Sequence, residues 1–252
     1  MRPKMRGNKK TSSLPSERLN LNNFFQIIVF FCVLFTFAAS NSTKTDITIA
    51  TFNLHGFSKS SNYLKDCINS HSGIWFIQEH WLSESQLHQF QKIDAQFVAR
   101  SGMEDAVSSG IYRGRPFGGV SICWSPSMSH LITPMSNFKH KRIVAVELKT
   151  ANGNFLLISA YMPFYNSGRR DQCMAETVDA ISMIDLLIDD YPHHQVVIGG
   201  DLNTELKDES PFDVMWKGLM TKNHFAYCDH RSVCNISPLH LSSRFTKPDK
   251  IQ

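Results

Sequence analysis

The stretch Val196-Val197-Ile198-Gly199-Gly200-Asp201-Leu202-Asn203-Thr204 is the most informative segment of the chain. Three β-branched residues predict a short buried strand, and the two glycines predict a tight turn after it. Asp201 and Asn203 are two residues apart, so in an extended chain their side chains point the same way. A carboxylate beside an amide is suited to orienting a water next to a phosphate. The alternative is an Asx-type turn, in which both side chains serve only backbone donors.

The first 40 residues differ in composition from the rest. They hold six basic residues and one acidic residue, a balance of +5, whereas the whole chain of 252 residues carries +4. The remaining 212 residues therefore sum to −1, and any basic surface that binds nucleic acid must be local.

Residues 24–39 are almost wholly apolar and end in small residues. After a basic start, this pattern is typical of a secretory signal peptide or a membrane signal-anchor. We therefore predict a leader over residues 1–40, which makes the rest of the chain secreted or membrane-anchored. The alternative is a buried helix or a spurious upstream exon, which would leave the protein nuclear or cytoplasmic.

After residue 44 strands and helices alternate irregularly. Strands are predicted over 46–54, 73–80, 97–100, 118–124, 141–149, 155–162 and 195–198, and helices over 58–69, 171–190 and from 210. A capping box at 83–86 predicts another helix. Asn152-Gly153 is a strong hairpin signal. These patterns predict one domain over 44–252 of the α/β class, a four-layer α/β sandwich with two packed mixed sheets flanked by helices. A doubly wound parallel sheet is the alternative, and the hairpin disfavours it.

The helix over 171–190 has an amphipathic pattern. Its apolar residues predict which side packs on the sheet. The predicted buried residues are Met174, Val178, Ile181, Leu187 and Ile188.

Four predicted strands end in polar side chains, namely Asn53, Glu79, Tyr161 and the pair Asp201 and Asn203. Functional side chains often lie where strands of a rigid sheet end. Glu79 is a hard oxygen ligand suited to Mg²⁺, and Asn53 would orient it. Tyr161 would donate to a phosphate oxygen, Asn203 would stabilise developing charge, and Asp201 would align or deprotonate a water. Each residue alone also fits a structural role, but such residues at the ends of four strands together favour a functional site.

Two kinds of cluster bear on binding: basic residues that could contact nucleic acid, and Cys and His residues that could bind zinc. Arg169-Arg170 follows the strand of Tyr161, and we interpret this pair as substrate-binding. The basic run 139–142 could also contact a nucleic-acid backbone, but we interpret it as a solvated loop. Cys228, His230, Cys234 and His240 do not have the spacing of a usual zinc finger.

Five motifs occur in order: Phe52-Asn53-Leu54-His55-Gly56, Ile77-Gln78-Glu79-His80, Phe117-Gly118-Gly119-Val120, Tyr161-Met162-Pro163 and Gly199-Gly200-Asp201-Leu202-Asn203. Over about residues 46–250 the chain resembles the endonuclease/exonuclease/phosphatase superfamily, and within it the apurinic-type endonuclease domains of non-LTR retrotransposons.

This resemblance implies the same four-layer sandwich, phosphodiester hydrolysis with Mg²⁺ or Mn²⁺, and a nucleic-acid partner, DNA rather than RNA. By matched position it implies that Glu79 is a metal ligand, that Tyr161, Asp201 and Asn203 are catalytic, and that Asn53 is an active-site amide.

The chain departs from this family near its end. Family members close with a strand bearing a Ser-x-x-Asp-His motif, whereas residues 243–250 resemble only the segment before it. We therefore expect a domain that lacks its C-terminal strand and has reduced turnover. Three hypotheses follow. The chain is a DNA endonuclease domain of retroelement origin, a silent remnant that binds nucleic acid or protein, or a secreted or membrane-tethered nuclease or phosphatase, tethered through residues 24–39.

Overall fold

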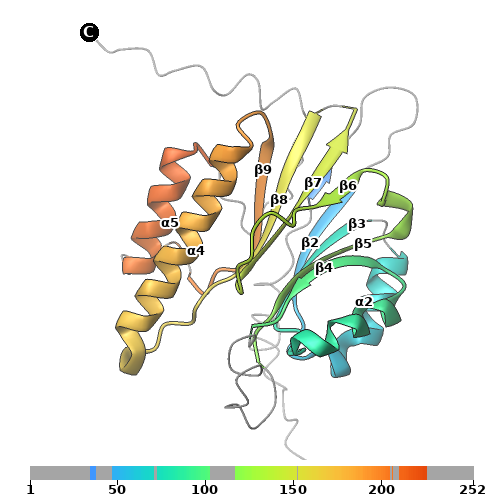
Figure 1. Ribbon diagram of the computed structural model, residues 1–252, viewed down its shortest axis with the longest axis horizontal. Helices are drawn as coiled ribbons and strands as arrows, with labels where there is room; N and C mark the ends of the chain where they lie inside the picture. Colours follow the sequence, from blue (N-terminus) through green and yellow to red (C-terminus); the bar gives the residue numbers. More distant parts are fainter. Residues whose placement is uncertain are drawn as a thin grey trace, which may run out of the picture.

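Two sheets lie face to face, and helices cover their outer faces (Figure 1). This arrangement confirms the predicted four-layer α/β sandwich. The computed structural model describes residues 35–37, 47–70, 73–102, 117–151, 153–204, 206 and 210–225. Three features of the sequence lie outside the described residues: most of the leader, the Cys and His residues over 228–240 that were compared with a zinc finger, and residues 243–250.

The first sheet has the strand order β1-β2-β3-β5-β4. Its strands are β1 (Phe35–Phe37), β2 (Ile47–Asn53), β3 (Gly73–Gln78), β4 (Gln96–Arg100) and β5 (Val120–Trp124). Only β2 and β3 pair in parallel, and the connection between them is α2 (Phe57–Ser70). The predicted capping box opens η1 (Glu84–Ile93), where the Gln86 side chain accepts a hydrogen bond from the Ser83 N–H at 3.1 Å. This helix is of the 3₁₀ type.

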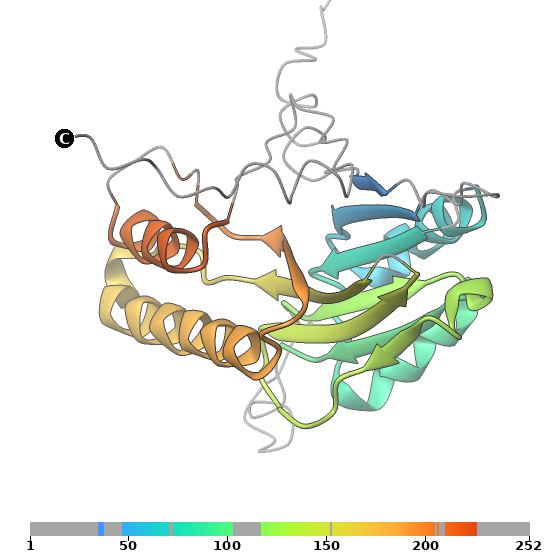
Figure 2. The ribbon, with the colours of Figure 1, turned by 90° about the horizontal axis from the view of Figure 1, so that it is seen from above.

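The second sheet has the order β6-β7-β8-β9. Its strands are β6 (Ile132–Pro134), β7 (Ile143–Thr150), β8 (Gly153–Tyr161) and β9 (Gln195–Asp201), with η2 (Pro126–Met128) before β6 and η3 (Ser167–Arg169) after β8. β7 and β8 form the predicted antiparallel hairpin. β8 and β9 pair in parallel through α4 (Arg170–Asp190), and α5 (Pro211–Lys222) follows. Figure 2 shows α4 and α5 together on the outer face of this sheet.

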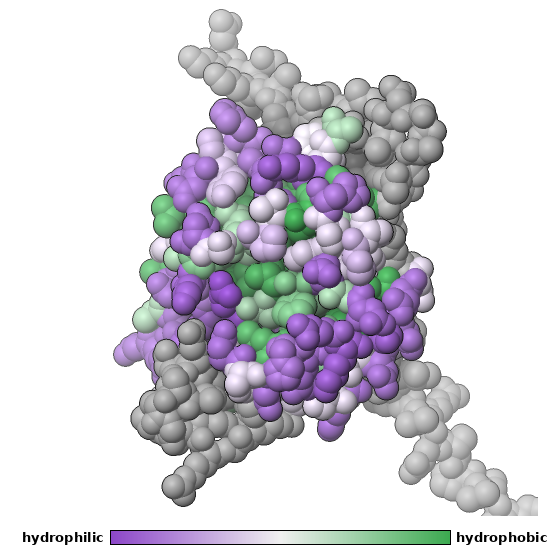
Figure 3. All heavy atoms as spheres, turned by 45° about the vertical axis from the view of Figure 1, so that its right-hand side comes forward, coloured by the Kyte–Doolittle hydropathy of each residue, from purple (hydrophilic) through white to green (hydrophobic). Residues whose placement is uncertain are grey.

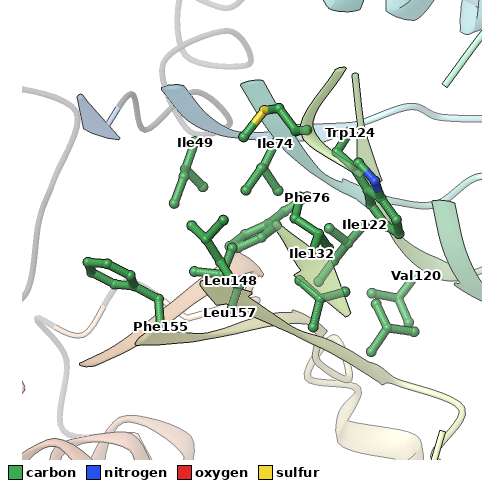
Figure 4. Packing of buried hydrophobic residues seen from close by; sticks show 13 residues of the cluster. Ile49, Ile74, Phe76, Val120, Ile122, Trp124, Ile132, Leu148, Phe155 and Leu157 are labelled. Atoms are coloured by element: carbon green, nitrogen blue, oxygen red, sulfur yellow. The ribbon is translucent and has the colours of Figure 1, made fainter. Parts of the chain in front are cut away.

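Three apolar layers hold the four structural layers together. The first lies between the sheets, where Ile74 and Phe76 from β3 face Leu157 from β8 (Figure 4). The second packs the first sheet on α2 and η1, and the third packs the second sheet on α4 and α5. Each large apolar side chain buried in these layers contributes about 1.5–3 kcal/mol.

The buried face of α4 differs from the predicted one. The residues that it buries are Cys173, Thr177, Ala180, Ile184 and Leu187. Of the predicted set, Leu187 is among them, and Ile181 and Ile188 are partly buried and pack against the same core. Val178 is 49% exposed, so it was predicted wrongly. Hydropathy alone ranks the buried Cys173, Thr177 and Ala180 below Val178, so the predicted face overlaps the buried one only in part.

The two glycines in the opening stretch do not form the predicted turn. Both lie inside β9, which is the last strand of its sheet among the described residues and is only partly buried. A Cβ atom on Gly199 would lie 2.4 Å from the Phe76 ring, and one on Gly200 would lie 1.9 Å from the Ala160 carbonyl oxygen. Gly200 also has a φ of +133°, a conformation that side chains rarely adopt. These glycines therefore allow β9 to approach both its neighbouring strand and the opposite sheet.

The outer surface is mixed. Figure 3 shows a face on which apolar side chains occupy the middle of the described surface and polar side chains surround them, which is ordinary for a globular domain. Among the described residues, no helix combines the length and the apolar character that a membrane crossing requires.

Candidate active site

The alternation of side chains along the strands explains why the predicted site residues meet. On β2, Ile49 faces the core between the sheets, and Asn53 lies four residues later on the same face. On β8, Leu157 faces the same core, and Tyr161 again lies four residues later. Tyr161 pairs directly with Asp201 in the parallel register of β8 and β9. The inner faces of both sheets thus change from apolar to polar at one rim.

The two sheets are joined at this rim by side-chain hydrogen bonds. The Gln78 amide of β3 donates to the Ser159 hydroxyl of β8 at 3.3 Å. Closer to the end of the strands, the Asn53 amide donates to Asp201 Oδ2 at 3.0 Å. Asn53 is 5% exposed, so this bond fixes the orientation of the carboxylate from the opposite sheet.

Asp201 and Asn203 do not project side by side. Asn203 has a φ of 49°, and its backbone N–H donates to Asp201 Oδ1 at 3.2 Å. Its side-chain amide donates to the Met162 carbonyl at 2.8 Å. This is the Asx-type turn considered as the alternative. The turn leaves Asp201 held at the rim, while the hydrogen bond of the Asn203 amide links the chain after β9 to the chain after β8.

Glu79 is the centre of the second group of contacts. Its Oε1 accepts a hydrogen bond from the Tyr161 hydroxyl at 3.1 Å, and its Oε2 lies 3.0 Å from His55 Nδ1. The Glu79 side chain is 16% exposed and that of His55 is 60% exposed. His55 lies in the first of the five motifs, but the sequence predicted no role for it. Its position two residues after Asn53 was the available signal.

Burial and like charge set the protonation of the two groups from the second sheet. Burial raises the pKa of Asp201 above its usual range, the hydrogen bonds from Asn203 and Asn53 partly oppose the shift, and the charge of Glu79 adds to it. Burial also raises the pKa of Tyr161, and the neighbouring Glu79 and Asp201 carboxylates raise it further. The Tyr161 hydroxyl therefore keeps its proton and acts as a hydrogen-bond donor at neutral pH.

A buried histidine supports the position of Glu79. His80 is fully buried, its Nε2 lies 3.0 Å from the Arg100 carbonyl oxygen, and its Nδ1 accepts from the Leu82 N–H at 3.1 Å. Burial lowers the pKa of His80 to about 4, and the carbonyl contacts only partly oppose it. A neutral ring with both nitrogens engaged anchors the chain next to Glu79. Gly119 is required here because a Cβ atom would lie 2.3 Å from the His80 ring.

The basic group closest to Tyr161 is not the predicted one. Arg142 Nη1 donates to the Tyr161 carbonyl at 3.1 Å, and the guanidinium also pairs with Glu176 of α4. Burial raises the pKa of Glu176, but the hydrogen bond and charge of Arg142 outweigh this effect and hold that pKa below its usual range. Among the described residues, no hydrogen bond or ion pair joins Arg169 or Arg170 to the site.

A small pocket opens beside Tyr161. Its lining residues include Gly102, Gly118, Phe117 and Phe164. Both aromatic side chains are exposed, at 56% and 73%. The remaining lining residues are Lys141, Arg142 and Tyr161. The run 139–142, which the sequence left as a solvated loop, therefore supplies cationic side chains next to a predicted catalytic residue.

The donor set is compatible with a divalent cation. Two carboxylates, Glu79 and Asp201, lie close enough for the charge of one to affect the other, and a cation held by Glu79 would offset that repulsion. In the described part of the chain, no cluster of three or more His, Cys, Asp or Glu side chains is arranged as a metal site. A cation that takes one or two protein ligands and completes its coordination with water and substrate needs no such cluster.

No family model and no curated protein matches this chain. Among solved structures, the chain is similar to the endonuclease domain of TRAS1, a telomere-specific non-LTR retrotransposon, with 12% identity, a TM-score of 0.48, and 75% of this chain and 72% of that chain covered.

It is also similar to the 3′ phosphatase NExo from Neisseria bound to a product DNA hairpin, with 14% identity, a TM-score of 0.46, and 69% and 70% coverage. The human Nocturnin catalytic domain matches with 12% identity, a TM-score of 0.43, and 69% and 68% coverage. Since these TM-scores lie below 0.5, the fold class rests on the two sheets and their helices.

Proposed function

We propose that this protein is a metal-assisted phosphodiester hydrolase that cleaves nucleic acid, with DNA as its substrate. One observation carries the proposal. Strand ends from both sheets bring Asp201, Glu79 and Tyr161 to one rim, where Asn53 orients Asp201 and Tyr161 donates to Glu79. A buried carboxylate, a second carboxylate and a protonated phenol are the groups that hydrolysis of a phosphate ester uses.

Each residue has a role that follows from its contacts. Asp201, oriented by the Asn53 amide, aligns the attacking water and accepts its proton; the burial that raises its pKa makes it a better base. Tyr161 keeps its proton and donates a hydrogen bond to Glu79 in the free protein; a nonbridging oxygen of the bound phosphate would replace Glu79 as the acceptor. Asn203 holds the turn after β9 in place through Met162 and Asp201.

A divalent cation, when bound, would polarise a phosphoryl oxygen and offset the charge that develops in the transition state. Glu79 would hold it, because its carboxylate is oriented by Tyr161 and remains partly accessible. The predicted cofactors Mg²⁺ and Mn²⁺ are both compatible with a carboxylate ligand.

The pocket beside Tyr161 supports a nucleic-acid substrate over a small phosphate ester. Exposed aromatic side chains stack on bases, and cationic side chains contact the phosphate backbone. Phe117 and Phe164 supply the aromatic surfaces, and Lys141, with a 42% exposed side chain, supplies charge. This pocket therefore replaces Arg169-Arg170 as the substrate contact that we propose nearest to the reaction.

Metal-dependent nicking of supercoiled plasmid by the full chain tests the proposal. Asp201→Asn should reduce the nicking rate by about 10²–10⁴-fold, as expected for loss of a general base. Asp94→Asn is a matched control, because Asp94 is an exposed carboxylate with a left-handed backbone that asparagine also tolerates. Equal rates for Asp201→Asn and the wild type, or no nicking by folded wild-type protein with any divalent cation, would contradict the proposal.

A further inference from the structure

His55 and Glu79 form a contact that the proposed reaction leaves unexplained. His55 Nδ1 lies 3.0 Å from Glu79 Oε2, on the side of the carboxylate that Tyr161 does not use. Burial does not force this contact, because the His55 side chain is 60% exposed. An exposed imidazole and a partly buried carboxylate meet in this way when the backbone directs them toward each other.

The backbone does direct them. His55 and Glu79 both have a left-handed conformation, with φ of 46° and 53°. Residues other than glycine adopt this region infrequently and at an energetic cost, and such strain gathers at functional sites. The Gly56 N–H donates to the Glu79 carbonyl at 2.8 Å, and the Glu79 N–H donates to the Gly119 carbonyl at 2.9 Å. The loops after β2 and β3 are therefore fixed to one another, and the pair is a built feature of the rim.

The separation of the two atoms fits adjacent ligands of one cation. Ligands about 2.1–2.2 Å from an octahedral cation, at right angles to one another, lie roughly 3.0 Å apart. The other oxygen of Glu79 accepts the Tyr161 hydrogen bond, which fixes the plane of the carboxylate, as ligands of metal sites commonly require. The remaining positions would be filled by water and substrate oxygens, since no third protein ligand is arranged here among the described residues.

We propose that His55 is a protein ligand beside Glu79, and that the site therefore prefers cations that accept an imidazole nitrogen, Zn²⁺ and Co²⁺ first and Mn²⁺ next, over Mg²⁺. Imidazole suits Zn²⁺ and Co²⁺, and Mn²⁺, although it favours oxygen ligands, accepts imidazole more readily than Mg²⁺, which takes oxygen ligands and retains its water. The inference rests on the proposed function, and it names the cation that the same site takes. The opposing interpretation is a plain ion pair, in which a protonated His55 neutralises Glu79 and competes with every cation.

The two interpretations predict opposite effects of removing the imidazole. The variant is His55→Asn, because asparagine tolerates the left-handed backbone and leaves no ring nitrogen. Calorimetric titration of the full chain with MnCl₂ and with MgCl₂, above the ordinary pKa of histidine, measures both affinities. We expect Mn²⁺ binding to weaken by roughly 10-fold or more, with Mg²⁺ binding changed by less than about 3-fold. Unchanged or tighter Mn²⁺ binding would overturn the proposal.

A second variant and a control sharpen the result. His55→Asp supplies an oxygen ligand, so it should move the preference toward Mg²⁺. His88→Asn is the control, because His88 is an exposed histidine on η1 whose ring contacts only the Ser85 carbonyl among the described residues. A loss of Mn²⁺ affinity of equal size in the control would count against a specific role for His55.

Pulsed electron paramagnetic resonance of the Mn²⁺-loaded wild-type chain gives a readout that does not depend on a variant or on activity. An imidazole ligand produces nitrogen hyperfine coupling, which Asp201→Asn should retain and His55→Asn should lose. Hydrolysis by a protein without nitrogen coupling would overturn this inference and leave the proposed function intact. Nitrogen coupling in a protein that cleaves no nucleic acid would support the ligand and contradict the proposed function.

Discussion

The two sheets contribute to the rim in different ways. The first sheet supplies Glu79 and His55 from loops with left-handed backbone, and their side chains remain accessible to solvent. The second sheet supplies Tyr161 and Asp201 from the last paired residues of regular strands, and burial raises the pKa of both. The first sheet thus presents accessible side chains that are able to bind and release a cation. The second presents side chains whose pKa values are raised by burial. A hydrolytic site needs both kinds.

The largest effect should come from breaking the close approach that brings the sheets together. Gly200→Ala places a methyl group against the Ala160 carbonyl at a φ of +133°, so we expect a loss of about 4 kcal/mol in the free energy of unfolding. Urea denaturation measures it. Gly218→Ala is the control, because nothing lies within 4 Å of its Cβ position on α5; it should stabilise by roughly 0.5–1 kcal/mol. A similar small gain for Gly200→Ala would show that the approach is not tight.

His80 makes the first sheet sensitive to acid. Its pKa is lowered by burial from 6.5 to about 4 in the folded chain, so the unfolded chain binds the proton first as pH falls. Stability should therefore decrease from pH 6.5 toward about 4, by about 3 kcal/mol from this residue. The free energy of unfolding as a function of pH, compared with His80→Gln, isolates this slope. If both proteins follow the same curve over that range, His80 is not the cause.

Tyr161→Phe separates the two roles of the phenol. It removes the hydroxyl, which donates to Glu79 in the free protein and would donate to the phosphate in the complex, but it keeps the ring between the sheets. Loss of one such donor should reduce the rate of cleavage by roughly 10²-fold, equivalent to about 2.7 kcal/mol, with little change in stability. Steady-state cleavage of a labelled oligonucleotide checks the rate. A rate equal to that of the wild type would remove Tyr161 from the reaction.

The pocket beside Tyr161 should affect binding more than the chemical step. Phe164→Ala removes an exposed aromatic wall, and loss of one stacking surface should weaken DNA binding by about 1–2 kcal/mol. Fluorescence anisotropy with a labelled single strand measures it. Leu186→Ala is the control, since Leu186 is an exposed apolar residue on α4 outside the pocket. Equal affinities for the two variants would mean that the pocket does not contact the strand.

The smallest effect concerns Asp201, and its sign is opposite to that of His80. A carboxyl whose pKa is raised in the folded chain favours folding while it is protonated, and this contribution is lost as pH rises through the folded pKa. Asp201→Asn should therefore be more stable than the wild type at neutral pH, and the difference should vanish toward acid. Thermal unfolding across this range tests it; a destabilised variant at neutral pH would show that the Asn53 bond outweighs burial.

Most of the fold was predictable because the strands and the hairpin follow simple periodicities. The ends of β2, β3, β8 and β9 place Asn53, Glu79, Tyr161 and Asp201 at one rim, as the sequence predicts. The buried face of α4 was predicted only in part, because the helix also buries Cys173, Thr177 and Ala180, which hydropathy ranks below the exposed Val178. The role of Gly199-Gly200 depends on Phe76 and Ala160, which are distant in sequence, so no local pattern reveals it. His55 was given no role because its contact with Glu79 joins two loops that are distant in sequence, and Lys141 belongs to the basic run that was interpreted as a solvated loop.

The central claim is that strand ends from both sheets act as one hydrolytic site, and a double-mutant cycle tests it most directly. Cleavage rates would be measured for the wild type, Glu79→Gln, Asp201→Asn and the double variant, with Mn²⁺ and Mg²⁺ in parallel. Residues that act as a unit are strongly non-additive. We predict that the double variant is about as slow as the slower single variant. Rate losses that multiply across the two sheets, or a wild-type chain that cleaves nothing with either cation, would contradict the account.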